Sequence, residues 1–202
     1  MSDTQRRIAE LTTLNALAQT LNRALDLHEA LDTALPHIVD LMGLQTGWIF
    51  LRDGEESFRL AARHDLPPAI GYPGSAWIEE CTCQELCLHG RLNKAVNIVR
   101  CSRLRHAIGD KRSLAQHASV PLVNGEQVVG ILNVATTAYG RFSEAQLQLL
   151  SAVGYLLGTS IARTRLHEQV KIRRVQEQAA LLNLSHDLLG ATSHVQALQR
   201  LV

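Results

Sequence analysis

The chain of 202 residues has few aromatic side chains and almost no net charge. Aromatic residues make up 4% of the sequence, which leaves a large planar cofactor few stacking partners. The formal net charge of +1 gives no reason to expect nucleic acid or an anionic membrane surface as a partner. The apolar content of 46% is nevertheless enough to bury a core of ordinary size.

The start of the chain has no long apolar run. Residues 1–21 are polar from the outset and place their apolar residues at helical spacing, so we predict neither a signal peptide nor a membrane span there. We therefore expect a cytoplasmic protein without membrane contact. In that compartment structural disulfides are disfavoured, and clustered thiols are more often metal ligands, catalytic groups or redox groups.

All the cysteines lie in one short segment of the chain: Cys81, Cys83, Cys87 and Cys101. Thiolates are soft ligands, and four of them complete either a tetrahedral zinc site or the protein ligation of an iron–sulfur cluster. Zinc sites prefer paired Cys-x2-Cys motifs, whereas this segment has a single Cys-x-Cys, and this difference favours the cluster. Nearby His89 and His106 carry imidazoles that ligate the same metals. The alternative is that the cysteines are small buried apolar side chains.

Two amphipathic helices are predicted at the start of the chain. Apolar residues recur at three- and four-residue intervals from Ile8 to Leu25, as on one face of a helix. Asp26 and Glu29 then form a capping-box pattern, and the second helix is predicted to end at Gly43.

Two β-hairpins and a long helix are predicted to follow. The Asp-Gly pair at 53–54 and the Asn-Gly pair at 124–125 are strong turn signals between apolar runs. Ser143 and Gln146 form a further capping-box pattern, which starts a helix that continues toward the end of the chain. The order helix, helix, hairpin, irregular segment, hairpin, helix predicts an α+β domain in which helices cover an antiparallel sheet.

Three stretches of the sequence resemble the GAF domain family: SFRLAARHDLPP, SVPLVNGEQVVGILNVATT and RFSEAQLQLLSAVGYLLGTSIART. The resemblance covers residues 5–165 and implies a GAF-like sensor domain over residues 1–165. It implies a ligand pocket between the sheet and the irregular segment, and a homodimer formed through the first and last helices. A heptad-like seam in the remaining residues 166–202 predicts a coiled-coil dimerisation helix, with Ile172, Val175, Ala179, Leu182 and Leu189 as its apolar positions.

The cysteine segment departs from the usual GAF pattern, since many relatives carry an apolar, glycine-rich stretch at this place. It is similar to the four-cysteine sets that some GAF domains of bacterial sensor kinases use as iron–sulfur redox or oxygen sensors. By this resemblance Cys81, Cys83, Cys87 and Cys101 are the cluster ligands. Zinc is the alternative metal.

Near the end of the chain, Ser185-His186-Asp187-Leu188 resembles the phosphoacceptor box of histidine kinases. By that resemblance the His186 imidazole attacks the γ-phosphate of ATP, while Asp187 orients it and accepts a proton. Leu189 and Thr192 depart from the usual box, and an ordinary helical His-Asp pair is the alternative. No glycine-rich nucleotide box follows, so we expect the ATP-binding kinase domain and the response regulator to be partners outside this chain.

Together these features predict the sensory input module of a two-component histidine kinase, which senses redox state or oxygen through an iron–sulfur cluster. One alternative is a GAF small-ligand sensor with structural zinc. The other is a free methionine-(R)-sulfoxide reductase, an activity that also sits on a GAF fold and uses cysteines near the pocket.

Overall fold

The computed structural model describes residues 3–23, 26–54, 56–71, 77, 81–98, 101–114, 116–136 and 142–199, and no side chain after Leu184. The chain divides into two compact units, Met1–Ala162 and Arg163–Val202. The first unit is an α+β domain with an antiparallel sheet and flanking helices, which confirms the predicted fold class. The second unit is helical in its described part.

Two helices open the first unit, α1 (Asp3–Arg23) and α2 (Leu27–Leu41). The Asp26 carboxylate accepts a hydrogen bond from the backbone N–H of Glu29 at 2.9 Å, so the predicted cap of α2 is confirmed. The apolar face of α2 is fully buried and packs against β1 and β2. On α1, Leu17 and Leu21 are buried within the chain, whereas Ile8 and Leu11 are exposed.

The sheet has five antiparallel strands in the order β2-β1-β5-β4-β3. Both predicted hairpins are present, with Gly54 and Gly125 at positive φ in the two turns. The sequence did not indicate the strand Val96–Ile98, which is only three residues long. The strands are β1 (Thr46–Asp53), β2 (Ser57–His64), β3 (Val96–Ile98), β4 (Gln116–Asn124) and β5 (Gln127–Thr136).

The long helix α5 (Glu144–Gln199) begins at the predicted capping box, in which Ser143 and Gln146 exchange hydrogen bonds. Its first turns lie directly on β4. A Cβ atom at Gly154 would meet the Pro121 carbonyl oxygen at 2.6 Å, and one at Gly158 would overlap the backbone of Val123. Only glycine allows this close approach of helix and strand.

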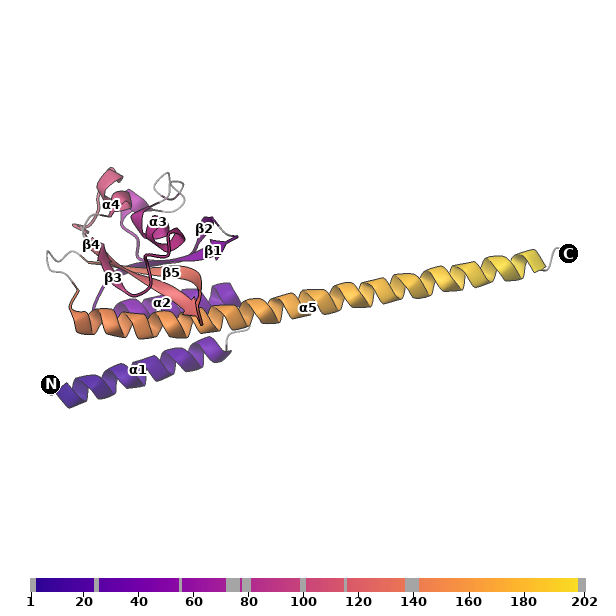
Figure 1. Cartoon of the computed structure of the whole chain (residues 1–202), viewed down its shortest axis with the longest axis horizontal. Helices are drawn as coiled ribbons and strands as arrows, with labels where there is room; N and C mark the ends of the chain where they lie inside the picture. Colours follow the sequence, from indigo (N-terminus) through magenta and orange to yellow (C-terminus); the bar gives the residue numbers. More distant parts are fainter. Residues whose placement is uncertain are drawn as a thin grey trace. The chain divides into compact units, whose positions relative to one another are not determined.

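The sheet separates two apolar cores. On one face α1, α2 and the first turns of α5 form the helix-side core, with Leu35, Ile49, Leu132 and Leu157 among its buried members (Figure 1). On the other face lie α3 (Thr82–Leu88) and α4 (Ser102–His106), after the short 3-10 helix η1 (Pro68–Ile70). There the segment-side core includes Trp48, Phe50, Ile70, Ile131 and all four cysteines.

By length and composition alone, α5 between Glu144 and Leu184 would be able to cross a membrane. A helix buried in a protein core passes the same test, and Leu150, Val153 and Leu157 of this stretch belong to the helix-side core. The predicted absence of membrane contact therefore stays a prediction. In the second unit the seam residues Ile172, Val175 and Leu182 are exposed within one chain, while the side chain of Leu189 lies outside the described residues.

Candidate functional site

A row of polar side chains crosses the sheet on the face that α3 and α4 cover. Strand side chains alternate between faces, and residues directly opposite each other share a face. Trp48 lies opposite Asn133 across β1 and β5, and Asn133 lies opposite Ser119 across β5 and β4. His117 is two residues before Ser119 on β4, so it lies on the same face.

All four side chains are buried, and we call three of them the donor array: Trp48 is 1% exposed, Asn133 0% and His117 2%. Within the described part of the chain, Trp48 Nε1, Asn133 Nδ2 and both ring nitrogens of His117 have no hydrogen-bond partner. The Asn133 Oδ1 atom, by contrast, accepts a hydrogen bond from the Ser119 hydroxyl at 2.8 Å. The hydrogen-bond donors of the array are therefore buried, and they form no hydrogen bonds with one another.

Arg103, on α4, places a buried positive charge beside the donor array. Its guanidinium carbon lies 4.5 Å from the ring centroid of Trp77 and 5.3 Å from that of Phe50, which are cation–π distances. The Trp48 ring centroid is 5.9 Å from that of Trp77 and 5.4 Å from that of His117. The Trp77 ring thus lies against both the guanidinium and the Trp48 ring of the array.

Burial, together with the positive charge of Arg103, lowers the pKa of His117 from 6.5 to about 3. Removal from water penalises the charged imidazolium, and a nearby cation penalises it further. At neutral pH the His117 ring is therefore uncharged, with one nitrogen as donor and the other as acceptor.

The four cysteines are positioned by the two short helices. Cys81 and Cys101 are the N-cap residues of α3 and α4, while Cys83 and Cys87 lie within α3. The backbone N–H of Cys81 donates to the Gln84 side chain at 3.0 Å, which completes a capping box. All four thiols are buried in the segment-side core.

The thiols of Cys81 and Cys83 are in direct contact, with their sulfur atoms 2.8 Å apart. The hydrogen bond from the Cys83 thiol, with the charge of Arg103, lowers the pKa of Cys81 to about 6 although burial opposes the shift. The same hydrogen bond and burial raise the pKa of Cys83. Burial also raises the pKa of Cys101 and of Cys87.

The donor chemistry fits a thiolate-ligated metal, since four soft ligands lie in one apolar core. The geometry fits less well. Among the described residues no group of three or more His, Cys, Asp or Glu side chains is placed to hold a metal ion, although Cys81 and Cys83 are in contact. His89 and His106 are exposed. The predicted four-cysteine site thus stays a prediction.

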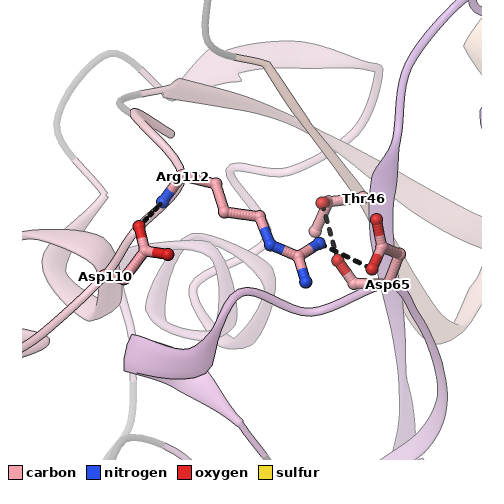
Figure 2. Close-up of polar contacts among 4 residues, drawn as sticks. All are labelled: Thr46, Asp65, Asp110 and Arg112. Atoms are coloured by element: carbon pink, nitrogen blue, oxygen red, sulfur yellow. Dashed lines mark hydrogen bonds and ion pairs between the residues drawn. The ribbon is translucent and has the colours of Figure 1, made fainter.

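A polar contact outside the core fixes the loop before β4 (Figure 2). The Arg112 guanidinium forms an ion pair with the Asp65 carboxylate at 2.6 Å, and Asp65 raises the pKa of Arg112. The Thr46 hydroxyl donates to the Asp65 carbonyl, and the Arg112 N–H donates to the Asp110 carboxylate. The end of β2 is thereby tied to the loop that joins α4 to β4.

The predicted phosphoacceptor pair, His186 and Asp187, lies on the part of α5 whose side chains are outside the described residues. The backbone there is helical, as the predicted dimerisation helix requires. The roles of both residues stay predictions.

A sequence profile described as "GAF domain" matches residues 24–162. This chain belongs to the GAF family. The Bacillus subtilis (strain 168) protein "Sensor histidine kinase YhcY" is 38% identical to this GAF chain over 188 residues. The match covers 90% of the chain and 50% of that protein, so the chain spans about half the length of this curated relative.

Solved structures share the GAF fold. The GAF domain of a phosphoenolpyruvate-protein phosphotransferase from Acinetobacter is 24% identical, with a TM-score of 0.62, and the match covers 84% of this chain and 99% of that one. The free methionine-R-sulfoxide reductase of Neisseria meningitidis is 15% identical, with a TM-score of 0.59 and coverage of 83% and 95%. Identities this low establish the fold alone.

The donor array and Arg103 were not among the site residues predicted from the sequence. A signal was present, because His117, Ser119 and Asn133 interrupt otherwise apolar strands at positions that share one face. Arg103 gave no such signal, since it lies among other basic residues in a short helix.

Proposed function

We propose that this GAF chain is the sensory input module of a two-component sensor histidine kinase and that its four cysteines hold an iron–sulfur cluster that responds to redox state or oxygen. The signalling half of the proposal is supported by the 38% identity with a sensor histidine kinase over nearly the whole chain. The cysteine half is supported by one observation above all, which is that four thiols share a single buried core.

The protein's own residues supply what a cluster needs. Cys81 and Cys83 would provide adjacent ligands from the start of α3, and the charge of Arg103 favours the thiolate form of Cys81. Burial of the thiols limits access of water. When bound, the cluster supplies a redox couple whose potential depends on hydrogen bonds to sulfur and on solvent exposure. Zinc bound to the same thiols would be a structural ion instead.

The test is purification of the chain without oxygen, followed by an absorption spectrum and by iron and zinc counts per chain. The proposal expects visible absorption, bound iron and loss of both in air. Single replacement of each cysteine by serine should lower the iron content, while His89→Ala and His106→Ala should leave it unchanged, because both histidines are exposed. A colourless protein without metal would refute the cluster. Bound zinc without iron would show that the cysteines hold zinc instead of a cluster.

The signalling half is tested by joining this chain to the ATP-binding domain of a sensor histidine kinase and following phosphorylation from ATP. We propose that His186 accepts the phosphoryl group there, with Asp187 beside it. His186→Gln should abolish phosphorylation from ATP, while His167→Gln, at another position of α5, should not. Undiminished phosphorylation of the His186 variant would rule out His186 as the phosphoryl acceptor. Equal rates of phosphorylation in air-exposed and anaerobic protein would rule out redox sensing.

A further inference from the structure

We propose that the donor array, formed by Trp48, His117 and Asn133 with Arg103 beside it, is a binding site for a small oxygen-bearing anion, either a carboxylate or an inorganic oxyanion. The donors of the array are not cysteines and need no metal, but Arg103 is shared with the cysteines, because its charge also acts on the Cys81 thiol. It goes beyond the proposed redox function, because it gives the module a second chemical input.

Several unpaired hydrogen-bond donors lie in one place. Leaving a buried donor unsatisfied costs about 1–3 kcal/mol, and more than 90% of buried polar groups in proteins are paired. Here the donors of Trp48, Asn133 and His117 lie on one face of three adjacent strands and have no partner within the described residues. A cluster of such groups is expected where an outside molecule completes the hydrogen bonds.

The polarity of these groups indicates which kind of ligand would pair them. An indole N–H only donates, and the Asn133 oxygen is already occupied by Ser119, which leaves its NH2 group. Neutral His117 adds one further donor and one acceptor. The array therefore offers mainly hydrogen-bond donors, and a matching ligand must present several acceptor atoms.

The charge near the array favours an anion. The buried charged and polar side chains of the described residues include the cation Arg103 and no carboxylate. The charge of Arg103 acts on the array, because it contributes to the lowered pKa of His117. Hydrogen bonds from neutral donors to an anion are about twice as strong as those to a neutral acceptor, so a nearby cation and several donors together favour an anion.

The spacing of the three groups indicates the size of the ligand. The ring centroids of Trp48 and His117 are 5.4 Å apart, and Trp48 and Asn133 are direct neighbours across two strands. A ligand of a few heavy atoms is therefore enough to reach all three groups. The rings of Trp48 and Trp77 would border it, which suits a flat group such as a carboxylate or a planar oxyanion.

The test uses the chain as purified and titrates it with formate, acetate, nitrate and phosphate at constant ionic strength set with chloride. Acetamide serves as the neutral counterpart of acetate. Calorimetry measures affinity, and tryptophan fluorescence reports on the site directly because both tryptophans of the chain border it. We expect saturable binding of at least one anion, with acetamide at least ten-fold weaker than acetate if the carboxylate arm binds. Binding of nitrate or phosphate alone would assign the inorganic class.

Two matched substitutions locate the binding. Trp48→Phe keeps a ring but removes an unpaired donor, and loss of a hydrogen bond to a charged group should weaken binding about ten-fold or more. Trp77→Phe removes an N–H that already donates to the Ile70 carbonyl at 2.8 Å, so it should change affinity far less. Asn133→Asp keeps the acceptor for Ser119 but replaces the NH2 group with an acceptor, and should abolish binding in a protein whose circular dichroism is unchanged.

Two results would overturn the proposal. The first is the absence of saturable binding for every anion, which would mean that water alone pairs the donors. The second is equal weakening by Trp48→Phe and Trp77→Phe, which would place the anion elsewhere. Iron is counted in the same samples, which are purified without oxygen, so iron-free protein that still binds an anion would refute the cluster and leave this site intact.

Discussion

Replacing His117 should change how the stability of the domain depends on pH. The unfolded chain protonates this imidazole below pH 6.5, whereas the folded protein resists protonation down to about pH 3. The unfolded state therefore binds more protons between these values, and the folded state loses stability as the pH falls. His117→Gln removes the titrating group and keeps a polar side chain of similar size.

The magnitude follows from the two pKa values. Each unit of difference corresponds to about 1.4 kcal/mol, so the imidazole destabilises the fold by about 2 kcal/mol at pH 5 relative to neutral pH. The free energy of unfolding of the wild type, minus that of His117→Gln, should therefore fall by about 2 kcal/mol between pH 7.5 and pH 5. The sign is opposite to that of an exposed histidine that gains an acidic partner on folding.

Urea unfolding followed by tryptophan fluorescence measures this difference at pH 7.5, 6 and 5. Protein concentration is held constant, and amine buffers are used so that no buffer carboxylate binds near the array. His37→Gln, on the exposed side of α2, is the matched control and should give a curve parallel to that of the wild type. A parallel curve for His117→Gln as well would show that His117 is not held neutral by burial and Arg103.

Three further predictions concern other parts of the chain. The exposed seam of α5 predicts a dimeric mass by light scattering. Val175→Glu should shift the mass toward that of a monomer, and Arg174→Glu should not. A monomeric wild type would contradict dimerisation through the seam. Gly158→Ala should lower the free energy of unfolding by about 1–3 kcal/mol, although alanine favours a free helix by about 1 kcal/mol. The control Thr159→Ala should be nearly neutral, and a stabilised Gly158 variant would show that α5 does not press on β4. Arg112→Gln should speed hydrogen exchange at the Ala69 amide, which donates to Asp110 at 2.9 Å, and Arg59→Gln on β2 should leave it unchanged.

The parts of the fold that the sequence predicted are those with strong local signals. Asp26 and Ser143 cap their helices by contacts within three residues, and glycine at positive φ forms both hairpin turns. The short elements α3, α4 and β3 gave no comparable signal. Their 3 to 7 residues are too few to display a period, and contacts with the rest of the domain hold them.

The candidate site was predicted only in part, because the sequence states which residues are close along the chain and not which atoms meet. The grouping of four cysteines was visible, but the contact between Cys81 and Cys83 depends on the first turn of α3. The donor array joins residues from β1, β4 and β5, and its members become neighbours only through the strand register. Arg103 reaches it from α4, which the sequence did not reveal.

Strand β4 borders both cores of the domain, and its backbone approaches that of α5 closely. His117 and Ser119 face the segment-side core, while Pro121 and Val123 further along the strand meet the backbone of α5 at Gly154 and Gly158. Glycines at this contact leave no flexible side chain to absorb a displacement, and close-packed interiors transmit strain. A shift of β4 by a fraction of an ångström would therefore move the start of α5 instead of being taken up by rotamer changes. Since α5 is one continuous helix from Glu144 to Gln199, a group that binds beside His117, as proposed above, would act on the strand that supports this helix.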